Sequence, residues 1–347
     1  MKKTKISPKM TIGGFPSSEV KHDNHLVSVI MTFYNAEKFI AEAFTSVVNQ
    51  VTSKNNTTIK IEFVIVDDKS EDSSREIIEK LTNEFNKTGN KNILINVVEP
   101  EKNLGCGGAR KFGIEHSSGA FLMFIDADDY YIHNDFVMRS FESINASQAD
   151  IVEWGMVMRQ PDGSAANVVA PQQMIIENNS PGAVVALFKD NLIKFNVWTK
   201  MYRREIIESR EYSSNRVFED VRTTPYWVFN AKRILIMPSC EVNYRAASGS
   251  IIRDDNMKTR LGTITAIAEL FEDFKQYKDV LKAMYQRAMV DLTAVLHGHS
   301  EENDGYNEMN RLNTYMLKYI YPDKWMQITY NPDIPEYLEE QEMFLKR

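Results

Sequence analysis

The sequence predicts an α/β protein with a mainly parallel β-sheet flanked by helices, followed by a helical C-terminal region. Between Leu26 and Ile125, apolar runs typical of buried strands alternate with amphipathic segments of helical period. Polar residues follow the carboxyl ends of these runs. A strand and helix alternation of this kind indicates a parallel sheet with right-handed crossovers.

The individual elements can be placed in order along the chain. We expect strands at residues 26–32, 59–67, 93–98 and 121–125. The intervening segments 36–49, 73–86 and 107–116 have a helical pattern. After Ser140 the pattern loosens into mixed strands, loops and helices up to about Arg253. The chain is therefore expected to divide into an N-terminal tail (1–25), an α/β domain (26–253) and a helical region (254–347).

The helical region is predicted from apolar residues that recur every three or four positions between Leu261 and Leu296. Such faces normally pack against one another. They could also dock on a membrane surface or on a second subunit, so peripheral membrane association and an oligomer formed through these helices stay open.

Composition excludes several classes of protein. With 41 Lys plus Arg against 48 Asp plus Glu, the net charge of -7 argues against a nucleic-acid partner. Cys106 and Cys240 are the only cysteines, which excludes a disulfide framework and fits a cytoplasmic protein. The sequence has no apolar run of membrane-spanning length, and its Lys-rich start lacks the apolar stretch of a signal peptide. We expect neither secretion nor membrane spanning.

An acidic cluster follows the last predicted strand. Asp126, Asp128 and Asp129 come directly after five apolar residues. Asp126 and Asp128 are two residues apart on a turn, so both can reach one Mg²⁺ or Mn²⁺ ion, which prefers oxygen ligands. The alternative is an Asp-rich turn that caps the next helix.

Polar residues also follow the other predicted strands. Thr32, Tyr34 and Asn35 end the first strand, and Asp68 ends the second. Ligands of open parallel sheets bind outside the carboxyl ends of the strands. Asn35 and Asp68 could each be a helix cap, but the convergence of several such ends on one rim favours a binding site.

A glycine-rich loop precedes the third predicted helix. It runs from Asn103 through Gly105 to Arg110, and a helix N-terminus with an arginine attracts phosphate groups. The loop matches neither a P-loop nor a dinucleotide-binding fingerprint. The alternative is a turn in which Gly108 and Ala109 pack the helix closely on the sheet.

Taken together, these segments resemble the motifs of family 2 glycosyltransferases with the GT-A fold. The matching segments are 27–35, 64–72, 103–110 and 124–129, with later pieces at 198–204, 218–220 and 244–245. They occur in the family's order, and the resemblance covers residues 26 to about 253. The helical region lies outside it.

The resemblance implies a donor site and a metal ligand set. Asp128 would bind Mn²⁺ or Mg²⁺ directly, and Asp126 would lie nearer the ribose. Of the three acids in the turn, Asp129 is the one that we expect to be only a cap. The resemblance and the later pieces together give the expected donor-binding residues Thr32, Tyr34, Asn35, Asp68, Gly105, Arg110, Asp126, Ala127, Lys200, Tyr244 and Arg245. Lys200 could instead merely end a strand, and Arg245 could be an ordinary surface arginine.

The resemblance also implies an acceptor-side acid pair, Glu219 and Asp220, with Asp220 as the general base. A carboxylate that deprotonates the acceptor hydroxyl as it attacks the anomeric carbon gives inversion. For Asp220 the alternative is an acid in the first turn of the helix that begins near Val221. Lys69 stands where the family usually has glycine, which predicts a less sharp turn after Asp68.

The expected activity is metal-dependent, inverting transfer of a sugar from a nucleotide-diphosphate donor, UDP-linked, to a glycan or lipid-linked glycan. The enzyme would be cytoplasmic, with possible attachment to the inner face of the membrane. Two alternatives remain: a sugar-phosphate nucleotidyltransferase, which should carry a basic glycine-rich loop after its first strand, and a non-catalytic nucleotide-sugar-binding module.

Overall fold

The computed structural model describes residues 24–159, 164–177, 180–189, 192–210, 212–213, 218–245, 257–296 and 304–323. The chain forms two compact units. The first comprises Met1–Asn178 and Asn196–Ser248, and the second Asn179–Phe195 and Gly249–Arg347. The N-terminal tail expected before Leu26 and the boundary expected at residue 253 fall almost wholly outside the described residues.

The parallel half of the first unit confirms the expected α/β fold. Its four strands are β1 (Leu26–Phe33), β4 (Lys60–Asp67), β5 (Ile93–Val98) and β6 (Phe121–Asp126). Their order is β6-β1-β4-β5, and every neighbouring pair is parallel. The central strands are buried on both faces, which explains why their sequences are continuous apolar runs.

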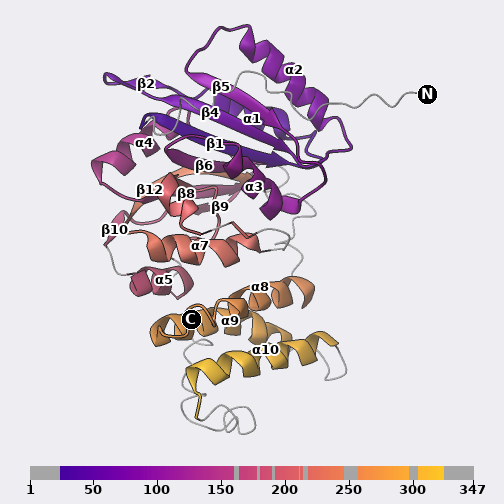
Figure 1. The fold of residues 1–347 in the computed structure, drawn as a ribbon, viewed down its shortest axis with the longest axis vertical. Coiled ribbons are helices and arrows are strands. Elements are labelled where there is room, and N and C mark those ends of the chain that lie inside the picture. Colours follow the sequence, from indigo (N-terminus) through magenta and orange to yellow (C-terminus); the bar gives the residue numbers. More distant parts are fainter. Residues whose placement is uncertain are drawn as a thin grey trace, which may run out of the picture. The chain divides into compact units, whose positions relative to one another are not determined.

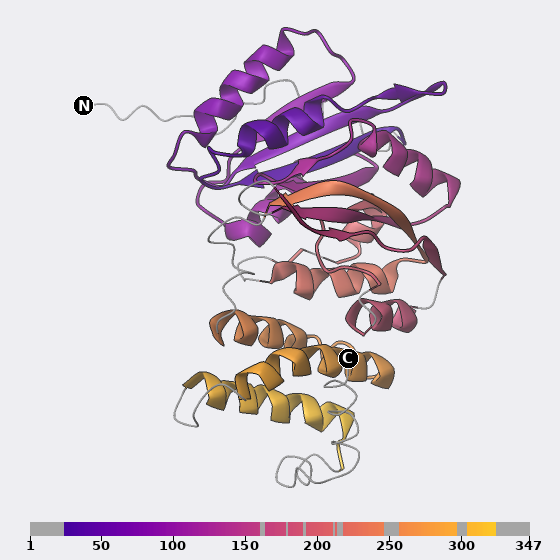
Figure 2. The same ribbon diagram turned by 180° about the vertical axis from the view of Figure 1, so that it is seen from behind.

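Three helices connect these strands: α1 (Ile40–Val48), α2 (Ser74–Asn86) and α3 (Gly105–Glu115). The chain moves outward from β1 to β5 and then returns to β6 on the far side of β1. Right-handed crossovers therefore place α3 on the face of the sheet opposite α1, as the views in Figure 1 and Figure 2 show.

The second half of the sheet is mixed. Its strands are β7 (Tyr130–Tyr131), β8 (Ile151–Arg159), β9 (Ala165–Val169), β10 (Met174–Glu177), β11 (Lys200–Arg203) and β12 (Arg233–Arg245). Strand β11 is antiparallel to both β6 and β8, whereas β12 is parallel to β8. A separate hairpin is formed by β2 (Ser53–Lys54) and β3 (Thr57–Thr58).

Three more helices complete the first unit: α4 (Phe136–Ala146), α6 (Arg204–Glu208) and α7 (Glu219–Asn230). Helix α7 packs on the sheet through Trp227, which is fully buried and stacks on Phe124 of β6 with ring centroids 6.4 Å apart. Tyr202 of β11 meets the same indole edge-on. This aromatic core packs α7 against β6 and β11.

The second unit is helical. It contains α5 (Ser180–Phe188), α8 (Met257–Glu269), α9 (Lys278–Leu296) and α10 (Asp304–Ile320). Helices α5, α8 and α10 all pack against α9. Helix α5 lies within residues 26–253, which were expected to form the α/β domain. Its place in the helical unit differs from that expectation. No described helix is both long and apolar enough to span a membrane.

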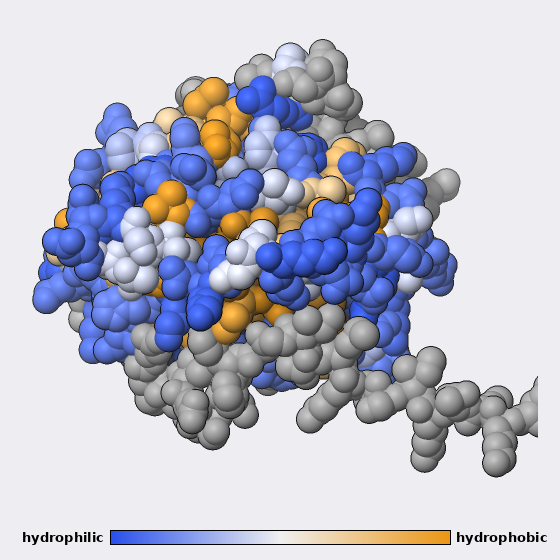
Figure 3. Space-filling view, turned by 90° about the horizontal axis from the view of Figure 1, so that it is seen from above, coloured by the Kyte–Doolittle hydropathy of each residue, from blue (hydrophilic) through white to orange (hydrophobic). Residues whose placement is uncertain are grey.

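Figure 3 shows one face of the molecule, which is mainly hydrophilic with apolar side chains in small separate patches. Most of the large apolar side chains that the structure describes are buried. Those that are well exposed are scattered as Tyr34, Val168, Ile175, Leu192 and Val290. Single exposed apolar residues of this kind are common on protein surfaces.

Candidate active site

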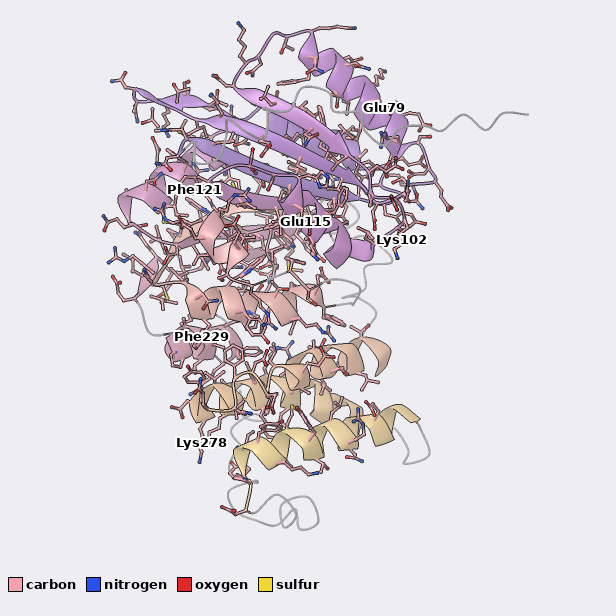
Figure 4. The ribbon with its side chains drawn as sticks, in the orientation of Figure 1. Glu79, Lys102, Glu115, Phe121, Phe229 and Lys278 are labelled. Carbon is pink, nitrogen blue, oxygen red and sulfur yellow. The ribbon has the colours of Figure 1, made fainter. Side chains whose placement is uncertain are left out.

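The carboxyl ends of β1, β4 and β6 form one rim. Thr32 lies between Val66 of β4 and Asp126 of β6 in the sheet register. Figure 4 marks the two ends of this sheet: Lys102 lies in the loop that follows β5, and Phe121 starts β6 at the opposite end. The expected donor-binding residues Thr32, Asp68 and Asp126 are therefore at the same edge.

Asp68 holds the glycine-rich loop against this rim. Its carboxylate is buried and accepts the backbone N–H of Leu104 at 2.7 Å, and its carbonyl accepts the side-chain amide of Asn103 at 2.8 Å. Gly105, with φ of +70°, turns the chain into α3. Burial raises the pKa of Asp68 above its ordinary value. Asp68 thus fixes the loop, whatever else it binds.

The turn after β1 is fixed by Asn35. Its φ is +52°, and its side-chain oxygen accepts the N–H of Glu71 at 2.8 Å. Tyr34 beside it is half-exposed. Across the rim, Lys69 has a φ of +69°, so this residue adopts the left-handed conformation that glycine would adopt. The expectation of a less sharp turn at Lys69 is therefore wrong.

The acidic turn after β6 presents two half-buried carboxylates. Asp126 and Asp128 are half-buried, whereas Ala127 between them is buried. Burial and the nearby charge of Asp126 raise the pKa of Asp128 to about 6. A bound cation would relieve this crowding of negative charge.

Asp129 does not cap a helix. The next helix, α4, has Asp135 at its N-terminal cap position. Asp129 is instead buried, and its Oδ1 accepts the backbone N–H of Arg245 at 2.8 Å. This corrects the expectation that Asp129 is only a cap: it ties the end of β12 to the acidic turn.

Arg245 is thereby brought beside the acidic turn. Its guanidinium donates to the carbonyl of Asp128 at 3.1 Å and pairs with Glu42 of α1. It also lies over the rings of Phe39 and Tyr130, about 5 Å from each centroid. Arg245 is thus not an ordinary surface arginine. The segment that follows it lies outside the described residues.

Arg110 lies deeper than the sequence suggested. Arg110 is 6% exposed, and its guanidinium donates to Oδ1 of Asp126 at 2.5 Å, to the hydroxyl of Tyr212 at 3.2 Å, and to Oε1 of Glu219. Arg110 therefore joins the acidic turn to the start of α7.

Glu219 and Asp220 begin α7 after Phe218, whose φ of +59° makes the turn into the helix. Asp220 is half-buried, and its Oδ1 accepts the N–H of Val221 at 2.8 Å. Burial and the neighbouring charge of Glu219 raise the pKa of Asp220 to about 6. Glu219 is paired with Arg110, whereas Asp220 is not among the described partners of that guanidinium, so the two neighbouring acids have different surroundings.

Lys200 and Tyr244, two expected donor-binding residues, have other contacts in the structure. Lys200 is fully buried in β11, where its ammonium donates to the carbonyl of Asn196 at 2.6 Å and lies 3.4 Å from Glu153. It is part of the core, so the expectation that it lines a cleft is wrong. Tyr244 is half-buried and stacks on Trp198 with ring centroids 5.3 Å apart.

Comparison with known proteins identifies the family. The family model described as glycosyl transferase family 2 matches residues 28–211, more than half of the chain. The chain belongs to glycosyl transferase family 2. The expected family and enzyme class are confirmed, and the nucleotidyltransferase alternative has no support.

Similar proteins include two bacterial glycosyltransferases. Glycosyltransferase GlyG of Streptococcus pneumoniae serotype 4 is 24% identical over 238 residues, which are 67% of this chain and 74% of GlyG. The uncharacterized glycosyltransferase EpsJ of Bacillus subtilis is 31% identical over 212 residues, 59% of this chain and 55% of EpsJ. The chain therefore spans only about half the length of EpsJ.

Solved structures of other proteins share the fold of this chain. Residues 1–349 of Staphylococcus aureus TarS in complex with UDP-GlcNAc share 18% identity and a TM-score of 0.65, over 92% of this chain and 91% of that one. The mannosyltransferase PcManGT of Pyrobaculum calidifontis, in complex with GDP-Man and Mn²⁺, has 14% identity and a TM-score of 0.53 over 86% and 87% of the two chains. These likenesses confirm the GT-A fold.

The sequence analysis missed Tyr212, Glu42 and Gly107. Tyr212 and Glu42 contact Arg110 and Arg245 from distant segments, and no local pattern marks such contacts. Gly107 carried a signal as part of the glycine-rich loop. A Cβ atom there would lie 3.1 Å from Cβ of Glu219 and closer still to the carbonyl of Ser213, so glycine lets α3 approach α7.

Proposed function

We propose that this enzyme transfers a sugar, with inversion, from a nucleotide-diphosphate donor to a hydroxyl of a glycan or lipid-linked glycan. The observation that carries the proposal is the arrangement around Arg110. The guanidinium of Arg110 joins the carboxylate of Asp126 to that of Glu219, the first residue of α7. This link between the segment of Asp126 and Asp128 and the segment of Glu219 and Asp220 supports a single site that contains the proposed metal ligands and the proposed base.

A divalent cation, Mn²⁺ or Mg²⁺, would be held by Asp128 and Asp126. Among the residues that the structure describes, no three His, Cys, Asp or Glu side chains form a ready-made metal site. Two carboxylates on one turn still suit a hard cation that takes its remaining ligands from a diphosphate and water. Burial, followed by the charge of Asp126, raises the pKa of Asp128, and a cation bound between the two carboxylates would offset both effects. When bound, the cation would neutralise charge on the leaving diphosphate.

The residues of the chain supply the other steps. Thr32, Tyr34, Asn35, Asp68 and Gly105 at the strand ends would bind the nucleoside, and Arg245 would meet the diphosphate. Asp220 would take the proton of the acceptor hydroxyl as its oxygen attacks the anomeric carbon. A carboxylate with a pKa of about 6 is a stronger base than an ordinary aspartate and is still mostly ionised at neutral pH.

The donor is proposed to be a UDP-sugar, with UDP-GlcNAc as the first candidate. Two similarities favour it. TarS of S. aureus, named a poly(ribitol-phosphate) beta-N-acetylglucosaminyltransferase, is 29% identical over 202 residues, although these cover only 33% of that protein. A TarS structure with UDP-GlcNAc shares the fold of this chain. A polyol-phosphate polymer is accordingly one acceptor to test.

A donor screen tests the proposal. UDP-GlcNAc, UDP-glucose, UDP-galactose and GDP-mannose would each be offered with Mn²⁺, and nucleotide release, sugar transfer and thermal stabilisation would be measured. A native-state ligand raises the melting temperature by mass action. Stabilisation by UDP only when Mn²⁺ is present, together with hydrolysis of one donor, is the expected result. Binding of a nucleotide sugar without hydrolysis or transfer would favour the non-catalytic module, and a chain that binds none of the nucleotides would refute the proposal.

A further inference from the structure

Glu219 does not stand alone at the start of α7, because Arg110 connects it to the donor side. One guanidinium nitrogen of Arg110 donates to Glu219 and to the hydroxyl of Tyr212, and the other donates to Asp126 at 2.5 Å. The side chains of Arg110 and Glu219 are 7% and 12% exposed, so solvent screens this contact weakly. The Arg110 charge is therefore shared between two carboxylates.

The backbone holds this contact in place. Gly107 lies one turn before Arg110 on α3, and a Cβ there would come within 3.2 Å of Cβ and Cγ of Glu219. Phe218, with φ of +59°, aims the first residue of α7 toward α3. Close approach and a fixed turn leave the Glu219 side chain little freedom to leave Arg110.

The sharing of Arg110 has an electrostatic consequence for the donor side. Asp126, Asp128 and Glu219 carry three negative charges around this one guanidinium. If Glu219 were neutral, Asp126 would be the one carboxylate that remains hydrogen-bonded to Arg110 among the described contacts. Its negative charge would then be more fully compensated, and a divalent cation would bind less tightly.

We propose that Glu219 is a positioning residue of the transfer reaction: by sharing Arg110 with Asp126, it leaves the negative charge of the donor-side carboxylates less fully compensated, so that they hold the cation more tightly. It touches neither substrate. Asp220, the next residue, does the proton transfer. This inference rests on the proposed function, and it assigns the two residues of the acid pair to opposite halves of the site.

Glu219 also sets the charge around Asp220. The charged groups near Asp220 are Arg110 of α3, Asp126 of β6 and Glu219 itself, and the phenols of Tyr202 and Tyr212 lie close by. After burial, the charge of Glu219 is the largest contribution that raises the pKa of Asp220. A neutral residue at 219 should therefore lower that pKa, which shifts the acid limb of the rate profile toward lower pH.

The test compares Glu219→Gln with wild type in two measurements. Calorimetry with UDP and Mn²⁺ should show about tenfold weaker Mn²⁺ binding, as expected for one lost charge near a partly buried site. The rate at saturating donor and metal should fall by less than about threefold at neutral pH, and its acid limb should move toward lower pH. Glu205→Gln, an exposed change on α6, is the control and should alter neither.

Glu219→Asp keeps the negative charge, so the acid limb of its rate profile should stay at the wild-type position. If Glu219→Gln does not fold, Glu219→Asp is measured in its place. The inference is overturned if Glu219→Gln leaves Mn²⁺ affinity and the pH profile unchanged. It is also overturned if transfer is abolished while Mn²⁺ and UDP bind normally, because Glu219 would then act on a substrate. Wild-type protein that neither binds UDP with Mn²⁺ nor transfers a sugar would refute the proposed function itself.

Discussion

The guanidinium of Arg110 lies 2.5 Å from Oδ1 of Asp126. Arg110 lies on α3, the helix that follows β5, and Asp126 is the last residue of β6. This pair therefore connects α3 to the carboxyl end of β6. The contact shows that Arg110 compensates part of the negative charge of the acidic turn, because the same guanidinium also binds Glu219. Changes at this turn should therefore affect donor binding and the acceptor side in different ways.

The base assignment predicts that Asp220→Asn keeps donor binding and loses transfer. Asn cannot accept the acceptor proton, and loss of a general base lowers rates by about 10²–10⁴-fold. Calorimetry with UDP and Mn²⁺ should give the wild-type affinity, while product formation should nearly vanish. Wild-type transfer by this variant would remove Asp220 from the mechanism.

A stability measurement checks the surroundings of Asp220 independently. The pKa of Asp220 in the folded protein, about 6, lies above its ordinary value of 3.8, so the ionised form destabilises the fold. Asp220→Asn should raise the free energy of unfolding by about 1–3 kcal/mol above pH 6. The gain in stability should shrink as pH falls from about 6 to about 4. It should disappear below about pH 4, where wild-type Asp220 is protonated in both the folded and the unfolded state. An equal gain at all pH values would contradict the raised pKa.

Activity should follow the same titration. The rate at saturating donor and metal should fall as pH drops through about 6, because protonated Asp220 cannot accept the proton. The measurement is a pH profile of this rate, and circular dichroism at each pH checks that the protein stays folded. A flat profile between about pH 5 and pH 8 would rule out this base.

The cation assignment predicts that Asp128→Ala abolishes Mn²⁺-dependent binding of UDP. The variant loses one of two proposed carboxylate ligands, and its remaining ligand, Asp126, is hydrogen-bonded to Arg110. Calorimetry with UDP in Mn²⁺ and in EDTA separates the metal-dependent affinity from the rest. Asp279→Asn, an exposed change on α9, should bind as wild type does.

Gly107 and Gly113 offer a matched pair on α3. Gly107→Ala should separate α3 from the start of α7, cost about 1–3 kcal/mol of stability and lower the rate by about 10²-fold. At Gly113 a Cβ would instead meet Cγ2 of Ile30 at 2.5 Å in the core. Gly113→Ala should destabilise comparably with a much smaller loss of rate. Equal losses of rate would mean that Gly107 matters only for folding.

Lys200 should prove structural. Lys200→Met leaves Glu153 buried without its cation and should cost about 3–5 kcal/mol of stability, while UDP affinity of the folded protein stays unchanged. The double variant Lys200→Met with Glu153→Leu removes both charges and should recover most of that loss. Chemical denaturation measures the stabilities. A selective loss of UDP binding would instead place Lys200 at the donor.

The parallel half of the fold could be predicted from the sequence because each strand there is an unbroken apolar run. Phe121–Asp126 is an example: five apolar residues are buried on both faces, and the first polar residue marks the rim. The mixed half was less predictable. Strand β11 has only four residues, and its place between β6 and β8 depends on long-range pairing that no local period encodes.

The site followed the same division. Residues at strand ends, such as Thr32, Asp68 and Asp126, could be placed because parallel strands end at one edge. The partners of charged side chains could not. Lys200 and Arg110 are both cations within segments that match the family motifs. Lys200 is buried beside Glu153, whereas Arg110 is buried between Asp126 and Glu219. These surroundings decide their roles, and they are set by the tertiary fold.

The assignment of α5 to the helical unit limits how this enzyme can be divided. The chain passes between the two units at three places, 178/179, 195/196 and 248/249. Truncation after Ser248 would leave α5 without α9, exposing Ala183, Val184, Leu187 and Phe188, which are now buried. Exchange of C-terminal regions between related enzymes would therefore have to exchange the α5 segment as well, so that the two pieces are inherited or engineered as one module.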